Sequence, residues 1–250
     1  MFKNLMIAIS DRFHLIAPDY PGFGFSDFPD SAHFKYSFKN IAEYINRFTE
    51  AIQLEHFIIY LHDYGCPIGL RICVNHPEKI RGMIVQNGNA YEEGIGPQWD
   101  ETKDYWEHPT EEKKKKVAAF LSEEGTRMQY TAGLPDEWLI RISPESYVLD
   151  WELMKRPGNI EMQFELNCDF KNNMEMYPEF QVYFRKYQPP ALIIWGKLDV
   201  FFDVKEAYCY QRDLPNARLH ILDGGHMLLE TNFDEVLSLI ERFLSEISKG

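Results

Sequence analysis

The chain has 250 residues, of which 45% are hydrophobic and 15% aromatic, and this is enough apolar material for one large folded domain or two small ones. Its formal net charge of −13 argues against binding to nucleic-acid phosphates or to acidic membranes. No stretch approaches the roughly 18 apolar residues that a membrane-spanning helix needs, and the N-terminus lacks the pattern of a signal peptide. We therefore expect a cytoplasmic protein.

Short apolar runs alternate with segments of helical periodicity, which is typical of an α/β fold with a mostly parallel sheet. Each apolar run ends at Gly, Pro, Asp or Asn, as strands commonly do. The expected strands lie at 14–18, 57–61, 80–85, 191–195 and 218–222. Helices are expected at 38–52 and 233–247, with Ser37 and Asn232 as N-terminal caps.

The segment 91–185 differs from its flanks, because it is rich in Trp, Tyr, Met and charged residues and shows helical patterns without a convincing strand. We expect it to form a helical insertion that caps the rest of the fold. Residues 1–90 then form the first part of an α/β core, and residues 186–250 form the second part. The run 111–116 (EEKKKK) is interpreted as an exposed helix face, because acidic residues flank it.

The four cysteines show no Cys-x-x-Cys pair and no nearby histidine at ligand spacing. This spacing predicts free thiols rather than disulfides or a zinc site. We expect no metal and no other cofactor. The cysteines are Cys66, Cys73, Cys168 and Cys209.

The run 60–67 (YLHDYGCP) ends a strand at an acid and begins a helix within three residues, which is the arrangement of a nucleophile elbow. Such a strained turn needs small neighbours, which Gly65 and Gly69 supply, and it places Asp63 at its tip. Backbone N–H groups at the start of the helix can stabilise an oxyanion there. On this segment alone, a simple helix-capping role for Asp63 is an equally good interpretation.

Two later strands end at residues that complete a catalytic triad. Asp199 follows one strand, and His226 follows the next in a glycine-rich loop. Each alone could be an ordinary turn or loop residue, but their joint occurrence after Asp63 follows the order nucleophile, acid, histidine. No Gly-x-Ser-x-Gly motif occurs, which disfavours a serine esterase.

These residues resemble the α/β-hydrolase superfamily, and within it the branch of epoxide hydrolases and haloalkane dehalogenases, whose nucleophile is the aspartate of His-Asp-(Trp/Tyr)-Gly. The segment 17–27 (APDYPGFGFSD) is also similar to that branch, and the resemblance spans essentially the whole chain. It implies an α/β-hydrolase core with a helical cap. It also implies that Asp63 forms an ester with the substrate and that the Tyr64 N–H binds the oxyanion while the ester is hydrolysed.

In that second step, His226 deprotonates water and Asp199 orients the imidazole. In some dehalogenases the acid instead follows the strand before the cap. The matching residues 86–89 (QNGN) have amides and no carboxylate, so the role stays with Asp199.

The residues that would handle the leaving group differ from both relatives. Dehalogenases hold halide with a Trp directly after the nucleophile, where this chain has Tyr64. Epoxide hydrolases protonate the opening ring with two cap tyrosines, and Phe170 stands where one of them is expected. The other candidates for substrate binding or for the acid are Tyr105, Tyr130, Tyr147 and Tyr177. We favour a small apolar epoxide, with a haloalkane as the alternative.

The resemblance further implies an N-terminally truncated core, because relatives carry about three strands and a His-Gly-x-Pro-like oxyanion loop ahead of the point where this sequence begins. Without the strand between 14–18 and 57–61, we expect direct pairing of these two, self-association through an exposed sheet edge, or poor solubility. A non-catalytic ligand-binding or interaction protein is the alternative to an enzyme. The expected partners are a small apolar substrate and water, with no nucleic acid and no membrane.

Overall fold

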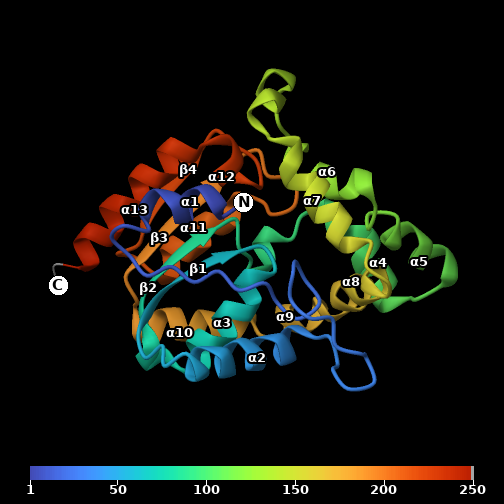
Figure 1. Cartoon of the computed structure of the whole chain (residues 1–250), viewed down its shortest axis with the longest axis horizontal. Coiled ribbons are helices and arrows are strands. Elements are labelled where there is room, and N and C mark those ends of the chain that lie inside the picture. The colour runs from blue at the N-terminus through green and yellow to red at the C-terminus, as the bar shows by residue number, and fades with distance from the viewer. Residues whose placement is uncertain (249–250) are drawn as a thin grey trace.

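A computed structural model describes residues 1–248, and its centre is a parallel sheet (Figure 1). The strand order is β1-β2-β3-β4, and each neighbouring pair is parallel. The strands are β1 (Phe57–His62), β2 (Ile80–Gln86), β3 (Ala191–Gly196) and β4 (Arg218–Leu222). Their carboxyl ends meet at one edge of the sheet, where α/β folds bind ligands. The α/β class and four of the five expected strands are confirmed.

The prediction of a strand at 14–18 is wrong. This segment is irregular, and among residues 1–248 no backbone hydrogen bond joins it to β1. Leu15, Ile58 and Tyr60 instead pack against the same apolar cluster. An apolar run becomes a strand only where a neighbouring strand takes its hydrogen bonds, and a sequence pattern does not show whether that neighbour exists. β1 is therefore an edge strand, and the two segments do not pair directly.

Helices cover both faces of the sheet, because strand side chains alternate between the faces. In β3, Ile193 and Trp195 enter one apolar core, whereas Leu192 and Ile194 enter the other. The first core is covered by α2 (Phe38–Ala51), α3 (Gly65–Asn75), α10 (Tyr177–Tyr187) and α11 (Lys205–Asp213). The second core is covered by α1 (Lys3–Ile9), α12 (Leu228–Thr231) and α13 (Phe233–Ile247). Figure 1 shows α1 and α13 on the side of the sheet away from α2, α3 and α10.

The two predicted caps have different outcomes. Ser37 caps α2, since its Oγ accepts a hydrogen bond from the backbone N–H of Asn40 at 3.2 Å. Asn232 stands at the start of α13, but no side chain caps that helix. The Asn232 amide donates instead to the carbonyl of Asp223 at 3.1 Å, so its predicted capping role is wrong. The side chain that the pattern predicted as a helix cap thus hydrogen-bonds to a carbonyl in the loop that leads to His226.

The chain between β2 and β3 contains helices and, within the described residues, no strand. The helices are α4 (Asp100–Glu107), α5 (Glu111–Ala118), α6 (Glu123–Thr131), α7 (Pro144–Met154), α8 (Asn159–Asp169) and α9 (Lys171–Met174), followed by α10. α4 to α8 project to one side in Figure 1, whereas α10 packs on α3 in the core. The run 111–116 lies on α5 and is largely exposed, as interpreted.

Short 3₁₀ turns complete the described chain. They are η1 (Pro77–Lys79), η2 (Glu92–Gly94), η3 (Pro97–Trp99) and η4 (Asp136–Arg141). None of the helices within residues 1–248 has the length and apolar character needed to cross a lipid bilayer.

Candidate active site

Asp63 lies at the tip of a strained turn between β1 and α3. Its φ of 43° is in the left-handed region, which costs a non-glycine residue about 1 to 2 kcal/mol. The helix approaches the strand closely behind this turn, because a Cβ at Gly69 would come within 2.3 Å of Leu61. Tyr64 is the N-cap residue of α3, and no side chain caps that helix. The geometry therefore favours a nucleophile elbow over a helix-capping role for Asp63.

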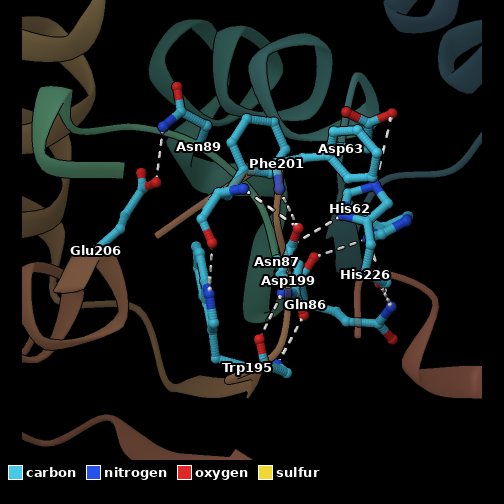
Figure 2. Close-up of polar contacts among 12 residues, drawn as sticks. His62, Asp63, Gln86, Asn87, Asn89, Trp195, Asp199, Phe201, Glu206 and His226 are labelled. Carbon is cyan, nitrogen blue, oxygen red and sulfur yellow. Dashed lines mark hydrogen bonds and ion pairs between the residues drawn. The ribbon is translucent and has the colours of Figure 1, made fainter. Parts of the chain in front are cut away.

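His226 lies in the loop after β4 and is 3% exposed. Its Nδ1 is 2.8 Å from Oδ2 of Asp199, and its Nε2 is 4.0 Å from Oδ2 of Asp63 (Figure 2). Burial lowers the pKa of His226, but the charge and hydrogen bond of Asp199 and the charge of Asp63 outweigh it, so the pKa is raised. Burial raises the pKa of Asp63, while His226 and the Tyr64 N–H oppose that rise. The structure thus brings all three triad candidates together.

Asp199 is held by four donors around its carboxylate. Its Oδ1 accepts the backbone N–H groups of Phe201 at 2.7 Å and Phe202 at 3.2 Å. Its Oδ2 accepts from His226 and also from the side-chain amide of Asn87 at 2.7 Å. Burial raises the pKa of Asp199, but His226 and the other donors lower it more, so the net pKa is lowered. The carboxylate is therefore kept ionised beside the imidazole.

Asn87 is a site residue that the sequence did not reveal. It follows β2 with a φ of 42°, a conformation that asparagine tolerates better than most residues. Its Nδ2 donates to Asp199, and its Oδ1 accepts the Gly196 N–H at 3.0 Å, so one side chain ties two strand ends together. The run 86–89 has no carboxylate, which is the group that a triad acid requires. An Asn-Gly pair at the same sheet edge as Asp63 was the available signal.

His62 and Gln86 also contact His226, and the sequence did not reveal these two roles either. The His62 ring lies 4.6 Å from the His226 ring, centroid to centroid, and its Nδ1 is 2.9 Å from the Gln86 carbonyl. Burial, and then repulsion by His226, lowers the pKa of His62 to about 3. His62 therefore stays neutral. The Gln86 amide donates to the His226 carbonyl at 3.3 Å, which fixes the histidine loop.

None of the four candidate tyrosines in the insertion forms a hydrogen bond with Asp63 among the described residues. Tyr130 donates to Asp150 at 2.5 Å and packs against Tyr147 in a separate apolar cluster. The Tyr177 hydroxyl is buried in the main core and has no hydrogen-bond partner in the described chain. Tyr105 packs against Phe164.

An aromatic cluster lies over the elbow, and Phe170 is at its centre. Phe170 stacks on Trp99 with 4.5 Å between the ring centroids. It also stacks on Trp106, with 6.4 Å between the ring centroids. The Tyr64 ring lies 6.1 Å from Phe170. Trp99 also donates its indole N–H to the Phe201 carbonyl at 3.0 Å, next to the Asp199 loop. Phe170 therefore joins the insertion to the elbow.

The described residues contain no group of three or more His, Cys, Asp or Glu side chains arranged to hold a metal ion. The four cysteines are unpaired. Cys66, directly after the elbow, is buried with its Sγ 3.5 Å from the Tyr210 hydroxyl. Burial raises its pKa well above the usual value, so the thiol stays protonated.

A family model described as alpha/beta hydrolase fold matches residues 1–233 of the chain. An uncharacterized hydrolase of Saccharomyces cerevisiae, YNR064C, is 36% identical over 254 residues, which cover 100% of this chain and 85% of that protein. A cis-3-alkyl-4-alkyloxetan-2-one decarboxylase of Shewanella oneidensis is 26% identical and covers 98% of this chain and 78% of its own length. Both similarities extend over nearly the whole chain.

Among solved structures, an epoxide hydrolase of Bacillus megaterium in complex with an inhibitor superposes with a TM-score of 0.67. The match covers 98% of this chain and 88% of that one at 18% sequence identity. At this identity the likeness concerns the fold alone.

Proposed function

The chain belongs to the α/β-hydrolase fold family, and on that basis we propose that it hydrolyses a small apolar epoxide through a covalent ester on Asp63. The observation that carries the proposal is the placement of His226 between Asp199 and Asp63, with Asp63 on a strained turn. A carboxylate is a weak nucleophile toward carbonyls, but it can open a strained ring at an sp³ carbon. The site therefore suits ring opening better than acyl transfer.

The proposed reaction has two steps. In the first, a carboxylate oxygen of Asp63 bonds to a ring carbon, the carbon–oxygen bond of the epoxide breaks, and its electron pair stays on the departing oxygen. In the second, His226 takes a proton from water, which attacks the ester carbonyl. The backbone N–H of Tyr64, which lowers the pKa of the Asp63 carboxyl, stabilises the oxyanion. Collapse of this intermediate releases the diol and restores the carboxylate.

The surroundings of Asp63 support an apolar substrate. The Tyr64 ring, which follows Asp63, packs against Phe38 and Phe170, and Phe170 stacks on Trp99. We propose that α4 to α8 act as the cap over this site and that residues 1–90 and 186–250 form the core, with α10 packed on the core. Aromatic side chains beside a carboxylate exclude water, which strengthens the charge interactions among the triad residues.

A haloalkane is the alternative substrate, because the same carboxylate can displace a halide. The Shewanella relative is named for an oxetanone, which is another strained ring that contains oxygen. A substrate panel should therefore contain a terminal epoxide, a bromoalkane of the same chain length and a disubstituted oxetan-2-one. Turnover of any compound in this panel would argue against the alternative of a protein that binds a ligand without catalysis.

Intact-mass spectrometry tests the covalent step. We expect the His226→Gln protein to gain the mass of the epoxide and the Asp63→Asn protein to gain none, because ester formation needs the carboxylate and ester hydrolysis needs the base. His33→Gln is the matched control, since His33 is exposed and lies outside the triad. No added mass on His226→Gln with any member of the panel would remove the covalent mechanism.

The outer edge of β1 supports a second, separate proposal about partners. β1 pairs only with β2 in the described chain, and most of its side chains are half-buried rather than covered. Exposed sheet edges favour pairing with another chain. We propose weak self-association through this edge. Sedimentation velocity over a range of protein concentrations tests it, and a single monomeric species throughout would refute it.

A further inference from the structure

We infer that the phenol of Tyr64 donates a proton to the leaving oxygen while Asp63 attacks the ring, and that Asn167 holds the same oxygen. This role rests on the proposed function and deepens it. It assigns to Tyr64 a side-chain task in the first step, whereas its backbone N–H acts in the second. It also replaces the four tyrosines of the insertion, none of which is hydrogen-bonded to Asp63 in the described chain.

The position of the Tyr64 ring is fixed by its neighbours. Tyr64 follows Asp63 directly and begins α3 with helical φ and ψ of −57° and −26°. Its ring meets Phe38 edge-to-face at 4.9 Å and lies tilted beside Phe170 at 6.1 Å. Phe170 is the residue at which α8 ends. The Tyr64 ring therefore lies between the elbow, where Asp63 precedes it in the chain, and the end of α8 in the insertion.

Asn167 adds a second polar group to the same space. It lies on α8 three residues before Phe170, hence on nearly the same helix face, and its side chain lowers the pKa of the Tyr64 phenol, which burial raises. Its Oδ1 is buried and has no hydrogen-bond partner in the described part of the chain. Buried polar groups are nearly always paired, so an unpaired one calls for an explanation. The hydroxyl group that forms when the ring opens can donate to this Oδ1 and so provide the missing partner.

The protonation state of Tyr64 suits a donor. Burial raises the pKa of the Tyr64 phenol, and the charge of Asp63 raises it further. The phenol therefore stays protonated throughout the neutral range. An alkoxide is a much stronger base than a phenolate, so the proton passes readily to the oxygen of the opening ring.

Other hydroxyl groups fit this task less well. The Tyr130 hydroxyl donates a hydrogen bond to Asp150. The Tyr177 hydroxyl lies in the core, where burial raises its pKa most and the charges of Glu206 and Cys66 raise it further. The Tyr20 hydroxyl lies over Gly65, but its pKa is raised by burial and then by Cys66, with no contribution from Asp63. Tyr64 is the phenol that shares the electrostatic environment of the nucleophile.

The step balances without a further reactant. The Asp63 oxygen bonds to carbon, the ring carbon–oxygen bond breaks, and its electron pair takes the phenol proton to give a hydroxyl group. The phenolate left on Tyr64 regains a proton from solvent before the next turnover. A bromide leaving group departs as an anion and needs no proton. The role of Tyr64 should therefore appear with epoxides and not with bromoalkanes.

The experiment compares ester formation in two backgrounds. His226→Gln and Tyr64→Phe/His226→Gln proteins are mixed with a terminal epoxide or with the bromoalkane of the same length, and the rate of mass gain is measured. We expect the Tyr64→Phe change to slow the epoxide reaction by about 100-fold or more. The bromoalkane reaction should change by less than about threefold, because the backbone N–H of residue 64 remains and no proton is transferred.

Asn167→Ala in the His226→Gln background is the second variant, and we expect an epoxide rate about tenfold lower from the loss of one hydrogen bond. Tyr105→Phe is the matched control and should leave both rates unchanged. Equal loss with epoxide and bromoalkane, or no loss with either, would overturn the role of Tyr64. Absence of any ester on His226→Gln with Tyr64 intact would remove the proposed function itself, and this role with it.

Discussion

The two sides of the site differ in how completely their polar atoms are paired. On the side of β2, β3 and β4, the Asp199 carboxylate accepts four hydrogen bonds, and Asn87 is paired at both ends of its amide. On the side of the insertion, Oδ1 of Asn167 and Nε1 of Trp106 are buried without a partner in the described chain. The protein alone completes the pairing of Asp199 and Asn87, although Nε2 of His62 and Oδ1 of Asn89 elsewhere in the core are also buried without a partner in the described chain. The second side carries the polar atoms that a substrate would pair.

The same contrast extends to the chain that leads into the insertion. The fully buried Glu206 accepts the backbone N–H groups of Ala90 and Tyr91 and the amide of Asn89, which is 2.7 Å away. Burial raises the pKa of Glu206 well above its usual value, and these three donors oppose the rise. The segment after β2 is thereby fixed to α11 beside the Asp199 loop. Rigid support of the base and an adaptable substrate side are a common division of labour in enzymes.

The largest effect should come from the fully paired side. Asp199→Asn leaves an amide against Nδ1 of His226, which favours the wrong tautomer of the imidazole. We expect turnover to fall by about 10³- to 10⁴-fold, with the ester accumulating because hydrolysis needs the base. Steady-state assays measure the fall in turnover, and intact-mass spectrometry measures the accumulated ester. Asp223→Asn is the control, since the Asp223 carboxylate pairs with the exposed Lys197 and lies outside the triad. A loss below tenfold would show that Asp199 is not the acid of the triad.

Asn87→Ala tests whether the second hydrogen bond to Asp199 matters. It removes a donor to a carboxylate and the acceptor of the Gly196 N–H, and it leaves an alanine at a φ of 42°. A hydrogen bond to a charged group contributes about 1.5 to 3 kcal/mol, which is about ten- to a hundredfold if turnover loses all of it. Kinetics and thermal melting should both show the loss. The exposed Asn216→Ala serves as control, and an unchanged rate would assign Asn87 a purely structural role.

The pH dependence follows from the raised pKa of His226. Only the neutral imidazole can take a proton from water, so ester hydrolysis should fall about tenfold per pH unit below that pKa. Because the pKa is above its usual value of about 6.5, the rate should still rise through neutral pH. Stability has the opposite sign: protonated His226 stabilises the fold below about pH 6.5, and this contribution is lost as pH rises through the folded pKa.

Single-turnover rates and melting temperatures across pH test both signs. The His226→Gln protein should lack the change in melting temperature above neutral pH that the unmodified protein shows. A hydrolysis rate that falls as pH rises through neutrality would contradict the assignment of His226 as base.

The sequence was sufficient for the parts of the site that depend on local order. Asp63, Asp199 and His226 each follow a strand, and parallel strands bring such positions to one edge. The sequence was insufficient where contacts between distant segments determine the local structure. The segment 14–18 has strand composition without a pairing neighbour, and Glu206 acts on residues that lie more than a hundred positions earlier in the chain.

Glu206→Gln should have the smallest effect on catalysis and the clearest effect on stability. The replaced oxygen becomes a donor, and all three partners of Glu206 are themselves donors, so one N–H must face another. We expect the free energy of unfolding to fall by about 1 to 3 kcal/mol, with turnover changed by less than about tenfold. Reorientation of the Asn89 amide limits the loss, because its Oδ1 is buried without a partner in the described chain and can accept from the new amide.

Urea unfolding measures the change in stability, and steady-state kinetics measure the change in turnover. Glu93→Gln, at an exposed carboxylate nearby, is the matched control. A fall in turnover as large as that of Asp199→Asn would show instead that Glu206 acts on the reacting groups.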